Sequence, residues 1–171
     1  MIIMDIAIVG GHSATKDKDK SSYDEVWGIN RVGMNSRCKG LDGSILPQKW
    51  FDLHKSYNRD WLNQLNCPVY LRKKDEKVKK SEKYPRKEMI EKYGHRFGSM
   101  VAWVIAYAIE YGATKIGLYG IRMTCLHEYR EQRPNVLYWI GLCEGKGIDV
   151  YRADYKLQPL LDYPYGKLTN K

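Results

Sequence analysis

Residues 97–123 constrain the fold more than any other stretch, because a helix with clear start and stop signals leads directly into a buried strand. Ser99 is a good N-cap, and apolar residues at helical spacing follow it for about three turns. Gly112 is a typical helix stop. The short apolar run 115–120 then predicts a buried strand of a parallel sheet. A helix followed at once by such a strand is half of a βαβ unit, which predicts a wound α/β sheet.

Other segments supply the remaining elements of this sheet. Apolar runs of strand length predict further strands at 2–9, 23–30, 49–54, 68–71 and 148–151. Helices are expected at 60–65, at 84–93 and from Pro134 to the glycines at 145 and 147, and residues 33–46 are expected to be a loop. The predicted fold class is α/β, a single Rossmann-like domain over residues 1–171 with a mainly parallel sheet and helices on both faces.

The overall composition excludes several classes of protein. No apolar run reaches the roughly 18 residues of a membrane span, and residues 1–9 contain an acid and no basic leader. The four cysteines form no CxxC pair, so reduced thiols in a cytoplasmic protein without a metal site are expected. The sequence leaves open whether the chain forms a homo-oligomer.

The chain is strongly basic, with 29 Lys+Arg against 20 Asp+Glu and a net charge of +9. This excess favours an anionic partner such as a nucleotide, a sugar nucleotide or nucleic acid. Part of it lies in the run 72–80, which has the composition of a solvated loop and could also contact a phosphate backbone.

The first predicted strand ends in Gly10, Gly11, His12 and Ser13. Glycines after a strand let backbone N–H groups approach an anion, so this is the leading candidate for a nucleotide-binding loop. It matches neither the Walker pattern nor GxGxxG, and a tight turn without a ligand would use the same glycines.

Polar residues also follow other predicted strands. Asn30 ends the second strand, and Asp52 and His54 end the third. The carboxyl ends of parallel strands form one edge of the sheet, where open α/β sheets bind ligands. Gly98 and Ser99 open the long helix, and its N–H groups suit a phosphate. Ser99 is equally well explained as an N-cap alone.

Four histidines compete for the role of general base: His12, His54, His95 and His127. A histidine near neutral pKa can take a proton from an acceptor hydroxyl when a carboxylate holds its tautomer. Asp52 precedes His54 by two, so in a strand both side chains would share a face. For each histidine, the alternative is a surface or supporting residue.

Several segments together resemble a known superfamily. VGGHSA follows the first strand, WGIN closes the second, WFDLH forms the third, and RFGSMVAWVIAYAIEYGATKIGLYGIRM contains the long helix. This succession, over residues 4–166, resembles the superfamily of bacterial sialyltransferases and archaeal 6-hydroxymethylpterin diphosphokinase-like proteins. The ending EYREQRPNVLYWIGLCEGKGIDVY resembles that of a branch of small proteins common in tailed phages.

The resemblance implies a nucleotide site at the carboxyl edge of a Rossmann-like sheet. The residues Gly10–Ser13 match the Gly-Asn-Gly-Pro-Ser loop of the sialyltransferases, although the asparagine of that loop is missing. Asn30 matches their nucleotide-contacting asparagine. Gly98 and Ser99 match their Ser-Gly pair in reversed order.

The resemblance places the catalytic machinery less directly. The family's catalytic histidine falls near Arg130, with His127 three residues away, and Tyr129 is the candidate for a tyrosine that holds the leaving phosphate. Sialyl transfer itself is therefore in doubt, whereas the nucleotide site is retained.

The sequence thus predicts a nucleotide or nucleotide-sugar binding protein that transfers a glycosyl or diphosphate group and carries no bound cofactor. Arg130 or Arg133 would stabilise the departing phosphate, and His127 or His54 would activate the acceptor. Two alternatives stay open, a non-catalytic protein that sequesters a nucleotide and a basic nucleic-acid-associated protein. Whether the chain is an enzyme and whether a divalent metal assists are also open.

Overall fold

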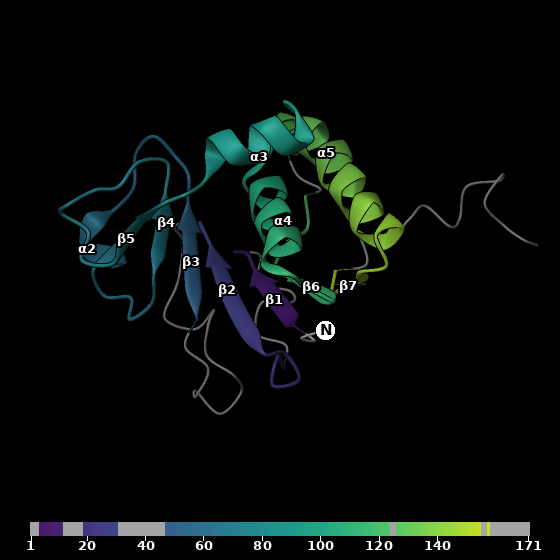
Figure 1. Ribbon diagram of the computed structural model, residues 1–171, viewed down its shortest axis with the longest axis horizontal. Coiled ribbons are helices and arrows are strands. Elements are labelled where there is room, and N and C mark those ends of the chain that lie inside the picture. Colours follow the sequence, from purple (N-terminus) through teal and green to yellow (C-terminus); the bar gives the residue numbers. More distant parts are fainter. Residues whose placement is uncertain (1–3, 12–18, 31–46, 124–125, 155–156, 158–171) are drawn as a thin grey trace, which may run out of the picture.

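The computed structural model describes residues 4–11, 19–30, 47–123, 126–154 and 157, with the backbone alone for 126–130. Its seven strands pair in one all-parallel sheet in the order β5-β4-β3-β2-β1-β6-β7 (Figure 1). The strands are β1 (Asp5–Val9), β2 (Glu25–Ile29), β3 (Lys49–Asp52), β4 (Val69–Leu71), β5 (Ser81–Lys83), β6 (Lys115–Tyr119) and β7 (Asp149–Arg152). The predicted parallel, Rossmann-like α/β fold is confirmed.

β1 is central because its residues are apolar on both faces. Ile6, Ala7 and Ile8 are fully buried. In the sheet, Ile8 lies opposite Trp27 of β2 on one side and Leu118 of β6 on the other. The chain winds from β1 outward to β5 and then returns to place β6 on the other side of β1. The strand order therefore reverses between β1 and β6, which we call the switch point.

One face of the sheet is covered by α4 (Met100–Tyr111) and α5 (Leu126–Gly145), which lie next to each other, with α3 (Arg86–Tyr93) beside them (Figure 1). Aromatic side chains fill much of this interface. Trp27 and Phe51 from the sheet meet Tyr107 of α4 with ring centroids 5.7 and 5.4 Å away.

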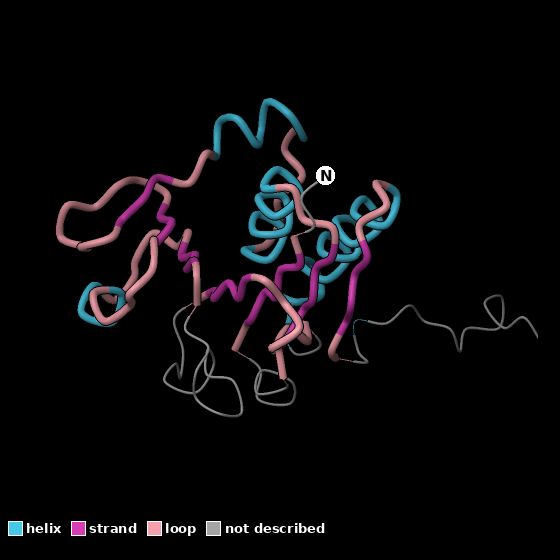
Figure 2. The backbone as a smooth tube through the Cα atoms, turned by 60° about the horizontal axis from the view of Figure 1, so that its bottom comes forward, coloured by secondary structure: helices cyan, strands magenta, loops and turns pink. Residues whose placement is uncertain are grey.

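The opposite face carries a smaller core under α2 (Arg59–Leu62), which lies apart from the other helices (Figure 2). Leu62 packs there with Trp50 and Val69. Gly28 of β2 makes room for the Trp50 indole, because a Cβ at that position would lie 2.0 Å from the ring. Helices on both faces were expected from the sequence, and the positions of α4 and α5 on one face and of α2 on the other confirm this.

The predicted ends of α4 are also confirmed. The Ser99 hydroxyl oxygen accepts a hydrogen bond from the N–H of Ala102 at 3.1 Å, as an N-cap does. Gly112 closes the helix with φ +92°, a left-handed conformation that glycine adopts without a steric penalty.

Two elements differ from the sequence-based expectation. β5 was not predicted, because it is a three-residue edge strand of mainly polar residues. The last helix begins at Leu126 and not at Pro134, so the prediction of its start was wrong. Proline is common in the first turn of helices, but here it lies inside α5 on the solvent side and removes one backbone hydrogen bond. The predicted loop at 33–46 lies outside the described residues.

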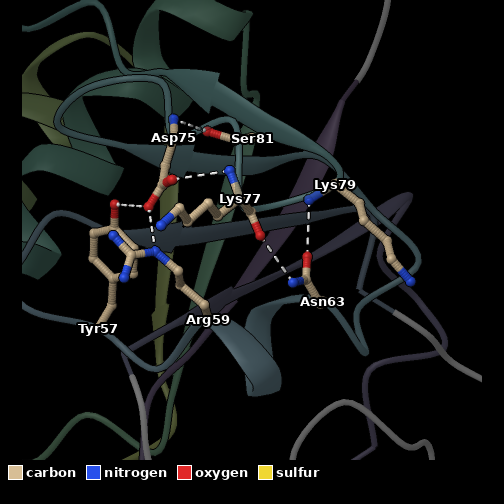
Figure 3. Close-up of polar contacts among 7 residues, drawn as sticks. All are labelled: Tyr57, Arg59, Asn63, Asp75, Lys77, Lys79 and Ser81. Atoms are coloured by element: carbon tan, nitrogen blue, oxygen red, sulfur yellow. Dashed lines mark hydrogen bonds and ion pairs between the residues drawn. The ribbon is translucent and has the colours of Figure 1, made fainter.

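The basic run 72–80 is an ordered loop built around the Asp75 carboxylate (Figure 3). Tyr57 and Arg59 both donate to its Oδ2 at 2.7 Å. The N–H of Lys77 donates to Oδ1 at 3.0 Å, and the Ser81 hydroxyl accepts from the N–H of Asp75 at 2.8 Å. These contacts fix the path of the chain from β4 to β5.

Candidate functional site

The all-parallel sheet brings the ends of its strands to one edge, which we call the carboxyl edge. Gly10 and Gly11 follow β1, Asn30 follows β2, and Asp52 and His54 lie at the end of β3. Because α4 runs antiparallel to the strands, its N-terminus also lies at this edge. The edge therefore combines most of the site residues predicted from the sequence.

Gly10 has a packing role at the switch point. Its N–H donates to the Tyr119 carbonyl at 2.7 Å, and a Cβ would lie 2.7 Å from the Gly120 oxygen. The close approach of β1 and β6 thus requires glycine here, and the Gly10 N–H is already used. Gly11 is exposed, whereas His12 and Ser13 lie outside the described residues.

Asn30 has two unusual features. Its backbone is left-handed, with φ 62°, which few residues other than glycine adopt. Its N–H donates to the Phe51 carbonyl at 3.1 Å, which fixes the turn after β2. The side-chain Oδ1 is buried and has no hydrogen-bond partner within the described ranges. A buried amide oxygen without a donor is costly, so a ligand donor at this position would be favourable.

The N-terminus of α4 is held by the neighbouring helix. Asn135 of α5 accepts from the N–H of Gly98 at 2.8 Å and donates to the Arg96 carbonyl at 2.8 Å. Ser99 is buried and its hydroxyl is used as the N-cap. The first-turn N–H groups of Met100 and Val101 are the ones that the helix does not use itself.

Asp52 and His54 form a close pair. The imidazole Nδ1 lies 2.7 Å from Asp52 Oδ1, and the backbone N–H of His54 donates to the same oxygen at 3.2 Å. The Asp52 side chain is 2% exposed, whereas that of His54 is 54% exposed. The buried carboxylate thus engages Nδ1 and leaves Nε2 to exchange a proton with a bound molecule.

A pocket of about 330 Å³ lies beside this pair, and we call it the basic pocket. It is lined by His54, Lys55, Tyr57, Arg72, Lys73 and Arg86. The pocket was not predicted from the sequence, since its residues come from the segment after β3, the segment after β4 and the start of α3. The available signal was basic residues directly after the third and fourth strands.

The remaining predicted residues lie on α5. The backbone of His127, Tyr129 and Arg130 belongs to the first turns of this helix, after the carboxyl end of β6, and their side chains are not described. Arg133 follows on the same helix and is half-buried. The sequence analysis treated this segment as preceding the last helix, so their placement on a helix is a correction.

The described cysteines are not nucleophiles. Cys67 and Cys143 are free and buried. Burial raises the pKa of the Cys67 thiol to about 11 and that of Cys143 to about 12, so both remain protonated at neutral pH. Cys38 and Cys125 lie outside the described residues.

The described ranges contain neither a metal site nor a membrane-spanning helix. No group of three or more His, Cys, Asp or Glu side chains there could hold a metal ion. No helix in these ranges is both long and apolar enough to cross a bilayer.

Comparison with known proteins supports the fold. No protein-family model matches the chain, and a search of curated proteins gives no significant match. Among solved structures, the sialyltransferase CstII from Campylobacter jejuni in complex with the substrate analogue cytidine-5′-monophosphate (CMP) is similar with a TM-score of 0.55 and 13% identity. That match covers 94% of this chain and 84% of the other. The same enzyme in complex with CMP-3FNeuAc gives a TM-score of 0.54 and 14% identity, over 87% and 79% of the two chains. The chain therefore has a sialyltransferase-like fold.

Proposed function

We propose that the protein binds a nucleotide sugar at the carboxyl edge and transfers its glycosyl group to an acceptor hydroxyl. The observation that carries this proposal is the Asp52–His54 pair, with 2.7 Å between Oδ1 and Nδ1. It lies one strand away from the buried Oδ1 of Asn30, which has no hydrogen-bond partner among the described residues. A general base and a nucleotide contact on neighbouring strands of a sialyltransferase-like fold support such a transfer.

The donor would occupy the region from Asn30 to the N-terminus of α4. A donor group on the nucleotide, such as a ribose hydroxyl or an exocyclic amine, would satisfy Asn30 Oδ1. The unused N–H groups of the first turn of α4 would face the phosphate, where the helix dipole favours negative charge. The exposed Gly11 would let the backbone approach the same group.

The acceptor would be activated by His54. Its Nε2 takes the proton of the acceptor hydroxyl while that oxygen forms the new glycosidic bond. The bond between the anomeric carbon and the phosphate oxygen breaks, and the nucleoside phosphate leaves with the electron pair. Asp52 holds the imidazole and stabilises its positive charge.

The first turns of α5 would assist at the leaving group. Tyr129, Arg130 and Arg133 lie on this helix, which follows β6 at the switch point. Cationic side chains there would stabilise the charge that develops on the departing phosphate. His127, on the same helix, is the other candidate for the base, as the resemblance to sialyltransferases implies.

Ligand binding is the first test. Thermal shift against nucleoside mono-, di- and triphosphates and sugar nucleotides, CMP and a CMP sugar included, is expected to show stabilisation by a nucleotide. Mass spectrometry of the ligand then separates three outcomes. A cleaved sugar nucleotide supports glycosyl transfer, and a nucleoside triphosphate converted to a monophosphate would instead indicate diphosphate transfer. A ligand returned intact in the presence of acceptors would contradict catalysis and favour a sequestering protein.

The role of the base is tested by His54→Gln. We expect kcat to fall by about 100-fold or more with little change in donor binding, because the variant cannot take the proton. His95→Gln makes the same change at the other histidine whose side chain is described, and it is expected to keep kcat because no carboxylate is hydrogen-bonded to His95 among the described residues. A normal rate for His54→Gln together with a large loss for His127→Ala would transfer the role of base to His127.

A further inference from the structure

The basic pocket has the size of a site for a small ligand. Its volume of about 330 Å³ lies at the lower end of the range typical of small-molecule sites. It lies at the ends of β3 and β4, where Arg72 directly follows β4. Asn30, the proposed nucleotide contact, follows β2, which pairs with β3, and neighbouring strands are about 4.8 Å apart. The pocket therefore adjoins the proposed nucleotide site, and His54 is part of its lining.

The charge of the pocket is strongly unbalanced. Four of its six lining side chains are cationic, namely Lys55, Arg72, Lys73 and Arg86, and none is a carboxylate. Within the described part of the chain, none of these four forms an ion pair. The carboxylates that contact the lining residues His54 and Tyr57 are already engaged. Asp52 is bound to His54, and Asp75 is bound to Tyr57 and Arg59.

The pocket is also held in place before any ligand binds. The Arg86 guanidinium lies over the Trp103 ring at 5.0 Å, and Trp103 stacks on Phe97 with ring centroids 3.7 Å apart. Tyr57 is fixed by its hydrogen bond to Asp75, the centre of the loop drawn in Figure 3. A preorganised side chain loses less entropy on binding, so Arg86 is positioned for a ligand.

These features point to an anion with several acceptor oxygens. Guanidinium groups bind phosphate through parallel N–H···O hydrogen bonds, and lysines add point charges. We propose that the basic pocket binds the phosphate group of a small phosphorylated acceptor. This inference rests on the proposed function, because it assigns the neighbouring His54 to a hydroxyl of the same acceptor. With phosphate held by Arg72 and Arg86, a pocket of this volume has room for the remainder of a sugar-sized molecule.

The first test is direct binding of sn-glycerol 3-phosphate, a simple phosphomonoester, followed by amide NMR at constant ionic strength. We expect saturable shifts confined to Lys55, Lys73 and neighbouring residues, and none with glycerol. Inorganic phosphate, the other source of the same chemistry, is titrated in parallel. Stronger binding of the ester than of free phosphate supports an acceptor site. Equal or weaker binding, or no saturation, would overturn the assignment to an acceptor.

The second test uses matched variants of the pocket. Arg72→Gln and Arg86→Gln are each expected to weaken glycerol 3-phosphate binding at least about tenfold, the size of a lost charge-assisted hydrogen bond. Lys74→Gln and Lys87→Gln remove the same charge from the same loop and the same helix but outside the pocket lining. They are expected to bind normally. An equal loss in these controls would reveal a general charge effect and contradict the proposal.

Two further measurements distinguish a loss of phosphate binding from misfolding of the variant and from failure of the nucleotide site. Arg86→Lys keeps the charge and loses the planar fork, so it should bind more tightly than Arg86→Gln and more weakly than the native protein. CMP binding is measured on the same variants. If the protein binds glycerol 3-phosphate but binds no nucleotide, the assignment of the pocket is kept and the proposed function is rejected. Glycosyl transfer without phosphomonoester binding would do the reverse.

Discussion

Asn30 combines two costs at a single residue. A left-handed backbone is unfavourable for a residue with a side chain, and a buried amide oxygen without a donor is unfavourable as well. Such strain is typical of functional positions, where the surrounding structure holds it in place. At Asn30 the turn is held by the hydrogen bond to Phe51 and by the parallel pairing of β2 and β3.

Two substitutions at Asn30 separate its backbone role from its side-chain role. Asn30→Gly accepts the left-handed backbone, whereas Asn30→Ala does not, so urea unfolding should find the alanine variant less stable than the glycine variant by about 1 kcal/mol. Both lack the amide, and both should weaken CMP binding by about tenfold. CMP bound as tightly by Asn30→Gly as by the native protein would exclude a side-chain contact.

Individual residues show what the sequence could and could not predict. The place of Asn30, Asp52 and His54 at one edge of the sheet could be predicted because strand ends are visible in the sequence and parallel strands bring those ends together. Ser99 was predicted with two possible roles, and its hydroxyl serves the N-cap. The basic pocket was missed because the proximity of Arg72 and Arg86 depends on the order of strands, which local sequence does not encode.

Elements with chemical signals at both ends were predicted best. α4 begins at a serine cap and ends at a left-handed glycine, so its bounds were visible in the sequence. α5 was predicted to start late because Pro134 is the usual signal of a helix start. β5 has three residues and little apolar character, and it pairs only with β4, so tertiary context alone makes it a strand.

The loop 72–80 shows how tertiary contacts order a segment that looks solvated in sequence. Besides the contacts of Asp75, the Asn63 side chain accepts from the N–H of Lys79 at 2.8 Å and donates to the Lys77 carbonyl at 3.0 Å (Figure 3). Val78 is buried with the core under α2. The lysine side chains of the loop are exposed while the backbone is held, and the loop presents Arg72 and Lys73 to the basic pocket.

Acid should release this loop. Hydrogen bonds from Tyr57, Arg59 and the Lys77 N–H lower the pKa of Asp75 from 3.8 to about 2. Because the folded pKa is lowered, the stabilisation is complete above pH 4 and is lost as the pH falls towards 2. The Lys77 amide shift should therefore titrate near pH 2. Asp75→Asn should abolish that titration, whereas Glu76→Gln in the same loop should not. A Lys77 titration midpoint near 4 would contradict the contact.

The strands of the sheet are covered and paired less completely from β1 towards the edge strand β5. β1 has a strand on each side and lies under α4, whereas β5 pairs with β4 alone. The cations of the basic pocket lie with β3 and β4, away from β1. The molecule thus joins a rigid apolar centre to a polar, basic flank that carries the proposed acceptor site.

This gradation predicts the pattern of native-state hydrogen exchange. The amides of Ala7 and Ile8, and of Leu118 beside them, should exchange only by global unfolding, whereas those of β5 should exchange by local opening. Ile8→Val should lower the free energy of unfolding by about 1 kcal/mol. Exchange at the central amides should therefore become faster by the full equivalent of that loss, whereas the exchange rates of the β5 amides should stay unchanged. An equal acceleration in β5 would mean that the sheet opens as one unit. In that case the basic flank could not move independently of the centre, and binding of an acceptor there would have to be transmitted to the switch point.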